Sequence, residues 1–186
     1  MSEKNNPYNI VIQNVVATSS VGTEIDLLAI MKTFRNVEYR PKKFPGLVFR
    51  LKNPKTATLI FTTGKMVCTG AKSEKLAGTA VRKVVRELKN AGFIITGIPK
   101  VIIQNMVSSA DLDAGIDLEE ASYVLDNIMY EPEQFPGAVY RMKEPKVVLL
   151  LFSSGKLVIT GSKSKEQVYE AVEKINSILV DNKLIY

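Results

Sequence analysis

Ionic side chains dominate the groups in this sequence that could do chemistry, because histidine is absent and Cys68 is the single cysteine. Without histidine, neither a Ser-His-Asp nor a Cys-His nucleophile can form, and no HExxH zinc site exists. One cysteine excludes an intrachain disulfide and a classical structural zinc site, and it favours a reducing, intracellular location. An enzyme would have to work with carboxylates, lysines or tyrosines, so we expect a protein that is not an enzyme and uses no cofactor.

The basic residues of greatest interest recur in two sets, 91 residues apart. They are Arg50, Lys55, Lys65 and Lys72, and then Arg141, Lys146, Lys156 and Lys163. The stretches around them, residues 44–73 and 135–164, align without a gap. A repeat of nearly half the chain indicates two copies of one unit rather than a solenoid of short units. Any single lysine is more often a solvated charge, but recurrence at a fixed offset favours a shared role for these residues.

Two other motifs are weaker candidates for ligand sites. TGK and SGK resemble part of a phosphate loop, but the full G-x-x-x-x-G-K-[ST] pattern is absent, so we do not expect ATP binding. Asp111 and Asp113 could suggest a metal site. The first copy has Ser20 and Gly22 at those places, so we interpret the segment as a loop and expect no bound metal.

The elements that position these residues follow the order β-α-β-β-β-β-α in each copy. Hairpin-linked strands predict an α+β fold with ten antiparallel strands and four helices that cover one face. We expect a tail over 1–8, a first repeat over 9–97 and a second over 98–186. Capping residues mark the helix starts at Asp26 or Thr23, at Ser73, at Asp117 and at Ser164. The expected apolar helix faces include Leu28, Met31, Leu76 and Val124.

Both faces of the predicted strands are largely apolar, although amphipathic helices on one side can cover only one of them. One interpretation is that the helices wrap both faces. The other is an open binding face, favoured by one Asn and one Thr per copy on it, by Phe44 and Phe135 in turns, and by the surrounding cations. The predicted open-face residues are Asn14, Val16, Leu59, Val67 and Thr69, and then Asn105, Val107, Leu150, Val158 and Thr160.

Five motifs carried in both copies resemble the TATA-box-binding protein family over about residues 9–183. They are QN[VM]V, the F-P-G turn, R-x-K-x-P-K, the Phe before [ST]-[ST]-G-K, and V-x-T-G-[AS]-K-S. The chain begins close to the first motif, as in archaeal members. The resemblance implies a curved sheet, or saddle, whose concave face lies in the minor groove of DNA and whose convex face carries the four helices.

The resemblance also assigns roles to the residues named above, in a mode of binding for which this family is the standard example. Phe44 with Phe61, and Phe135 with Phe152, would insert between base steps and bend an A·T-rich TATA element. The open-face residues would contact bases, the eight cations would bind phosphates, and Thr63 and Ser154 would touch the DNA backbone. The minor groove of G·C pairs adds an amino donor that an apolar face cannot accept, which gives A·T preference.

Charge differs between the halves, since residues 1–93 balance to +10 and residues 94–186 to −4. In the matching turns RPKK opposes EPEQ, and by resemblance the acidic turn with Glu131 and Glu133 would receive transcription factor B and, through it, RNA polymerase. The basic second helix of repeat one is either a regulator surface or simply solvated. We expect no membrane span, a monomer on DNA, and a nucleoid location in an archaeon or a nuclear one in a eukaryote; dimerisation of the free protein is left open.

Two other functions compete with promoter binding. An architectural protein would bend DNA without strong sequence preference, but the paired Asn and Thr residues argue against it. An enzyme on a related sheet would need a carboxylate cluster on the open face, and the sequence predicts none there.

Overall fold

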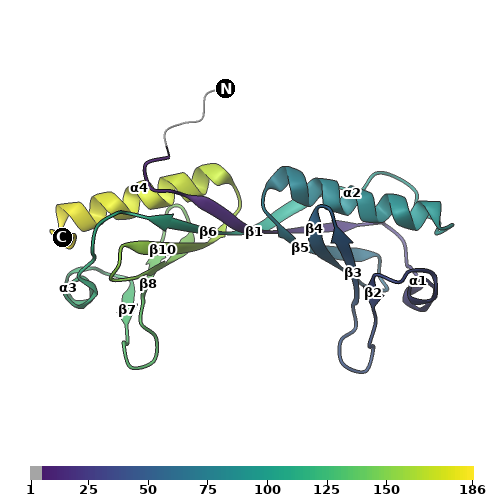
Figure 1. The fold of residues 1–186 in the computed structure, drawn as a ribbon, viewed down its shortest axis with the longest axis horizontal. Coiled ribbons are helices and arrows are strands. Elements are labelled where there is room, and N and C mark those ends of the chain that lie inside the picture. Colours follow the sequence, from purple (N-terminus) through teal and green to yellow (C-terminus); the bar gives the residue numbers. More distant parts are fainter. Residues whose placement is uncertain (1–5) are drawn as a thin grey trace. The chain divides into compact units, whose positions relative to one another are not determined.

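The computed structural model describes residues 6–186, and within them ten strands and four helices follow the predicted order twice (Figure 1). The first copy contains β1 (Val11–Ser20), α1 (Leu27–Thr33), β2 (Val37–Glu38), β3 (Leu47–Lys52), β4 (Lys55–Ile60), β5 (Lys65–Ala71) and α2 (Glu74–Asn90). The second contains β6 (Ile102–Asp111), α3 (Leu118–Val124), β7 (Ile128–Tyr130), β8 (Ala138–Met142), β9 (Val147–Leu151), β10 (Lys156–Ser162) and α4 (Lys165–Asp181). Residues 1–5 of the expected tail lie outside the described residues.

The strands belong to one antiparallel sheet, which confirms the predicted fold class. Their order is β2-β3-β4-β5-β1 through the first copy and β6-β10-β9-β8-β7 through the second. The chain packs as two compact units that are divided within β1 and β6. The first unit is Asn14–Gln104; the second unit combines the chain up to Gln13 with Asn105–Tyr186. The start of β1 therefore packs with the second copy, and the start of β6 packs with the first.

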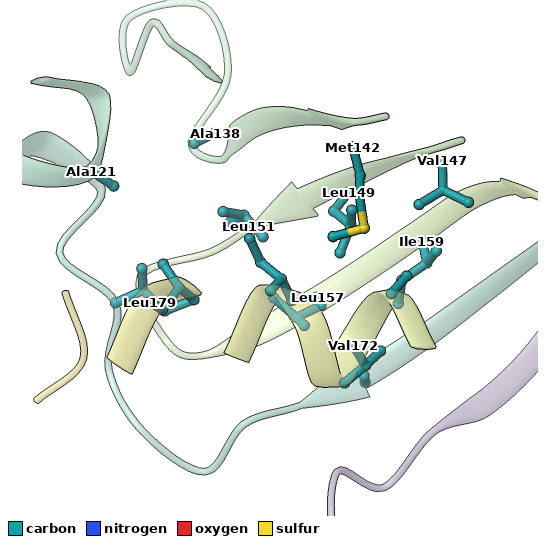
Figure 2. Close-up of a cluster of buried hydrophobic side chains, with 14 of the residues drawn as sticks. Ala121, Ala138, Met142, Val147, Leu149, Leu151, Leu157, Ile159, Val172 and Leu179 are labelled. Carbon is teal, nitrogen blue, oxygen red and sulfur yellow. The ribbon is translucent and has the colours of Figure 1, made fainter. Parts of the chain in front are cut away.

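Each unit has its own core between one long helix and one face of its strands. In the first unit α2 places Ala80, Val84 and Leu88 against Leu47 and Phe49 of β3, and all five are fully buried. In the second unit α4 places Val172 and Leu179 over side chains of β8, β9 and β10 (Figure 2). Full burial of each such side chain stabilises the fold by roughly 1.5–3 kcal/mol, so this face determines where the helices lie.

The helices begin at the predicted caps. Asp26, rather than Thr23, caps α1 by accepting from the Ala29 amide at 3.1 Å. The other three caps also accept from the amide three residues on: Ser73 from Leu76, Asp117 from Glu120, and Ser164 from Gln167. Each cap satisfies a helix N–H that otherwise has no partner and contributes about 1 kcal/mol.

Four residues expected in apolar helix faces are exposed instead. Leu28, Met31, Leu76 and Val124 retain 52%, 39%, 39% and 44% of their accessible surface. The two-turn helices α1 and α3 bury only one narrow stripe each, Leu27 with Ile30 and Leu118 with Ala121. Leu76 lies in the first turn of α2, before the helix reaches its buried stripe.

The opposite face of the strands is not covered by a helix in either unit. Along β4, Thr56, Thr58 and Ile60 are buried, whereas Ala57 and Leu59 between them are partly exposed. The same alternation runs through β1, β5, β6, β9 and β10. The described helices therefore do not wrap both faces, and the interpretation with an open apolar face holds.

Candidate nucleic-acid interface

The ten predicted base-contacting residues all lie on this open face, and all are partly exposed. Strand pairing brings them into rows. In the first unit Leu59 lies opposite Val67, and Thr69 lies opposite Ala57. In the second unit Leu150 lies opposite Val158, and Thr160 lies opposite Val148. Sequence reasoning missed further members of these rows that strict alternation would have identified: Val48, Ala57 and Thr18, and then Val139, Val148 and Ser109.

The two asparagines of this face are held with their amide carbonyls already engaged. The Gly70 N–H donates to Asn14 Oδ1 at 2.7 Å, and Asn14 Nδ2 donates to Thr69 Oγ1 at 3.1 Å. Gly70 has a φ of 98°, a conformation that glycine adopts without strain and that an L side chain rarely adopts. Because an amide nitrogen carries two donors, the group left for a ligand is an N–H donor.

The second unit repeats this arrangement. The Gly161 N–H donates to Asn105 Oδ1 at 2.7 Å, Asn105 Nδ2 donates to Thr160 Oγ1 at 3.3 Å, and Gly161 has a φ of 93°. The glycines of the V-x-T-G motif therefore orient the asparagines. Sequence reasoning did not identify that role, since the partners are more than fifty residues apart.

The four phenylalanines that we expect to insert into DNA form two edge-to-face pairs. The ring centroids of Phe44 and Phe61 are 6.0 Å apart at 67°, and those of Phe135 and Phe152 are 5.8 Å apart at 69°. Phe44 and Phe135 expose 43% and 38% of their surface. Each pair joins a turn residue to the residue directly after β4 or β9. Such a pair is a rigid apolar projection with little conformational entropy to lose when it inserts into a ligand.

Glycines in the F-P-G turns leave room for these rings. A Cβ at position 46 would lie 2.7 Å from Cε1 of Phe44 and 3.1 Å from Cε1 of Phe61. A Cβ at position 137 would lie 2.8 Å from Cε1 of Phe135. Gly46 and Gly137 thus permit the observed ring positions, which any larger residue would disturb.

Basic residues expected at phosphates gather in a groove of about 900 Å³ in the second unit. Arg141, Lys146 and Lys163 line it together with Lys143, and its lining holds no carboxylate. Lys143 was part of the quoted R-x-K-x-P-K motif but was not expected in this role. Strand β8, the connection between β8 and β9, and the loop before α4 bring these four charges together. The groove therefore suits a polyanion such as the nucleic-acid backbone.

The corresponding cations of the first unit, Arg50, Lys55, Lys65 and Lys72, are all exposed. Glu38 lies 4.0 Å from Arg50 and 3.0 Å from Arg40. Because the Glu38–Arg50 contact is solvent-exposed, it contributes little to the stability of the fold, and Arg50 can exchange Glu38 for another anionic partner.

The acidic turn expected to bind a protein partner is exposed at Glu131 and Glu133. No ion pair joins either carboxylate to another of the described residues. The carbonyl of Glu131 accepts from the amides of Gln134 and Phe135, so the turn that presents the acids also positions Phe135. In the matching basic turn, Arg40 accepts from Lys43 and Phe44 in the same way.

The basic face of α2 is partly engaged within the fold. Lys83 Nζ donates to the Asn53 carbonyl at 2.8 Å, and Lys89 Nζ donates to the Gly97 carbonyl at 3.2 Å. Lys174 of α4 donates to the Glu144 carbonyl at the place matching Lys83. Lys83 and Lys174 hold the β3–β4 and β8–β9 hairpins, and Lys89 holds the segment after α2. Arg82 lies over Gly78 on the helix surface.

A metal site, a thiol nucleophile and a membrane span depend respectively on metal ligands, the cysteine and the helices. No cluster of three or more metal-ligating side chains occurs among residues 6–186. Cys68 is fully buried, and burial raises the pKa of its thiol, so it is a poor nucleophile. None of the described helices has the length and apolar character needed to cross a membrane.

Comparison with known proteins agrees with the geometry. Residues 9–91 and 100–182 each match the family model described as "Transcription factor TFIID (or TATA-binding protein, TBP)". A TATA-box-binding protein of Pyrodictium occultum is 58% identical over 88% of this chain and 82% of its own length. One from Sulfurisphaera tokodaii is 52% identical over 94% of this chain and 89% of its own length.

A solved structure supports the same assignment. The TBP of Methanococcus jannaschii superposes with a TM-score of 0.86 at 48% identity, covering 92% of this chain and 98% of that one. Both the repeated sequence and the fold therefore match, and the chain belongs to the TATA-binding protein family of transcription factors.

Proposed function

We propose that this chain binds the minor groove of an A·T-rich promoter element through its open face, bends the DNA and recruits transcription factor B and RNA polymerase. Membership of a family of DNA-binding transcription factors makes it a non-enzyme. The observation that carries the proposal is the pair of oriented asparagines, Asn14 and Asn105, in an otherwise apolar face. A ligand for that face must offer hydrogen-bond acceptors near the asparagines and apolar or acceptor-only surface elsewhere.

The minor groove of A·T-rich DNA meets this requirement. A·T pairs display only acceptors there, adenine N3 and thymine O2, whereas G·C pairs add the guanine amino donor. The N–H groups of Asn14 and Asn105 pair with acceptors, because their carbonyls are already occupied by Gly70 and Gly161. A guanine amino group facing Leu59 or Val67 would lose its water without gaining a partner, at a cost of about 1–3 kcal/mol.

Bending follows from the phenylalanine pairs. Phe44 with Phe61, and Phe135 with Phe152, are apolar wedges of the kind that partly unstack a base step, at a cost of a few kcal/mol per step. That cost is offset when a bent, widened groove contacts more of the open face. The predicted phosphate contacts, including Arg141, Lys146 and Lys163 in their common groove, would hold the displaced backbone and make binding steeply salt-dependent.

Recruitment would use surfaces that the DNA leaves free. Glu131 and Glu133 are exposed, and their carboxylates form no ion pair with any of the described residues. They therefore fit a basic protein such as transcription factor B. We propose further that one copy of the protein binds each DNA element as a monomer. The complex would form in the nucleoid of an archaeal cell.

Three duplexes of one length test the specificity. One carries an A·T-rich element of eight base pairs, one a G·C-matched element, and one has inosine in place of each guanine. Inosine lacks the exocyclic amino group, so we expect tight binding to the A·T and inosine duplexes and at least about 100-fold weaker binding to the G·C duplex. Equal affinities for all three would contradict the proposal and favour an architectural DNA-bending protein.

A further inference from the structure

The first unit has a groove of its own, and one of the cations that line it, Lys100, has no basic counterpart in the second unit. The groove measures about 770 Å³ and is lined by Phe61 and Val67 of the open face together with Lys65 and Lys100. Lys100 lies two residues before the start of β6. Ser19 Oγ donates to the Lys100 carbonyl at 2.9 Å, which fixes this segment beside the end of β1. The groove therefore has two lysines next to the Phe44–Phe61 pair.

The matching place in the second unit carries different charges. The 91-residue offset pairs Lys100 with Asn9, Ser20 with Asp111, and Lys65 with Lys156. The segment around Asn9 is also held to the neighbouring strand, but through a backbone bond, since the Asp111 amide donates to the Tyr8 carbonyl at 2.8 Å. Strand pairing places Lys65 opposite Ser20 but Lys156 opposite Asp111. The first-unit groove thus has two lysines, whereas the matching place in the second unit has one lysine, Lys156, paired across the strands with a carboxylate, Asp111.

We propose that Lys100 binds a DNA phosphate beside the Phe44–Phe61 pair, and that Asp111 weakens the equivalent contact beside Phe135 and Phe152. The proposal rests on the DNA-binding function proposed above and adds to it an asymmetry on the DNA-facing surface itself. An A·T-rich element presents a nearly symmetric groove. If the protein binds phosphates more strongly at one end than at the other, it will prefer one orientation wherever the two DNA flanks differ in charge or accessibility.

Another charge difference acts in the opposite direction and shapes the test. Glu38 lies 4.0 Å from Arg50 in the first unit, and Met129 occupies its place in the second. The experiments therefore alter Lys100 and Asp111 individually rather than the total charge of either half.

The first experiment measures the salt dependence of binding to the A·T duplex. Each neutralised phosphate contributes about 0.9 to the slope of log affinity against log salt. Lys100→Asn installs the residue of the matching position and should make the slope shallower by about 0.9. A rise from about 50 to 200 mM salt should then reduce the variant's DNA affinity by a factor about 3.5-fold smaller than for the wild type. Asp111→Ser should steepen the slope.

A matched control removes a charge elsewhere. Lys75 is exposed on α2, which packs on the opposite face of the strands, and Lys75→Asn should leave the slope unchanged. Unfolding curves verify that each variant is folded; the Lys100 side chain is exposed and only its backbone carbonyl is bonded, so its replacement should not affect them. An unchanged slope for Lys100→Asn, or an equal change for Lys75→Asn, would overturn the proposal.

The second experiment reads orientation directly. A palindromic A·T-rich duplex carries neutral methylphosphonates at one flank and an acceptor dye at the same end. The protein carries a donor dye on the cysteine introduced by Glu166→Cys. Cys68 is buried and therefore stays unlabelled. We expect the Lys100 end to prefer the charged flank by several-fold, and Lys100→Asn to bring the two orientations towards equality. Equal orientations for the wild-type sequence would refute the inference alone. Failure to distinguish A·T from G·C duplexes would instead refute the proposed function.

Discussion

Gly46→Ala is the most informative single change, because it should displace Phe44, one of the side chains proposed to insert into DNA, without removing it. Ordinary carbon–carbon contacts lie at about 3.5–4.0 Å, so a Cβ placed 2.7 Å from Cε1 of Phe44 forces the edge of that ring to shift by roughly 1 Å. Gly46 does not have a positive φ, so the backbone accepts alanine. Phe44 is 43% exposed and can swing outward; the free energy of unfolding should therefore change by less than about 1 kcal/mol.

DNA binding should be more sensitive than folding to this shift. In the proposed complex, insertion of the Phe44–Phe61 pair costs a few kcal/mol of base unstacking, which contacts of the rings and the open face with the bent groove offset. A misplaced ring should lose part of those contacts. We expect a loss of about 1.5 kcal/mol, or roughly tenfold in affinity, together with a smaller bend. The bend is measured by energy transfer between dyes at the two ends of the duplex, and the affinity by titration of the same sample.

A double-mutant cycle separates ring displacement from other effects. The added methyl group would also lie 3.1 Å from Cε1 of Phe61, so the background must lack both rings. If alanine acts only through these rings, Gly46→Ala should have no further effect on bend or affinity once Phe44→Ala and Phe61→Ala are both present. An unchanged bend in the single variant would refute the reasoning. A further loss from Gly46→Ala in the background without both rings would refute it as well, since it would require a route from Gly46 to the DNA other than these two side chains.

Three further predictions concern other parts of the molecule. Glu131→Lys should preserve DNA affinity and impair formation of the ternary complex with transcription factor B, read by mobility shift; joint loss of both would indicate misfolding. Ser108 Oγ is buried and has no hydrogen-bond partner among the described residues, while Ala17 holds the matching position, so Ser108→Ala should stabilise the fold by up to about 1–2 kcal/mol in urea unfolding; destabilisation would reveal an unrecognised partner. Burial raises the pKa of the Cys68 thiol above its ordinary value of 9.0, so the folded state holds this proton more firmly than the unfolded state. The free energy of unfolding should therefore fall above pH 9.0, and it should fall less steeply in Cys68→Ala. Equal slopes of unfolding free energy against pH in the two proteins would count against this.

Local patterns accounted for most of the secondary structure. Asp26, Ser73, Asp117 and Ser164 cap their helices because a cap involves only residues three apart in sequence. Strand positions such as Leu59 and Val67 were assigned to the open face from alternation alone. Exposure of Leu28 and Leu76 was missed, because helical spacing identifies an apolar stripe but not how much of it a neighbouring element covers.

The arrangement of the candidate site depended on contacts between distant residues. By itself the sequence determined the duplicated unit, through the fixed 91-residue offset, and its strands and helices, through local periodicity. It favoured an open face without excluding helices on both faces, and the roles of Phe44, Phe61, Phe135 and Phe152 came from the family resemblance. Only the tertiary structure showed that Gly70 and Gly161 orient the two asparagines, that Lys143 joins the second-unit groove, and that Lys100 faces Phe61 while Asp111 faces Lys156. Those relations join residues tens of positions apart, and strand register and packing, rather than any local preference, bring their charges and hydrogen-bonding groups within reach of one another.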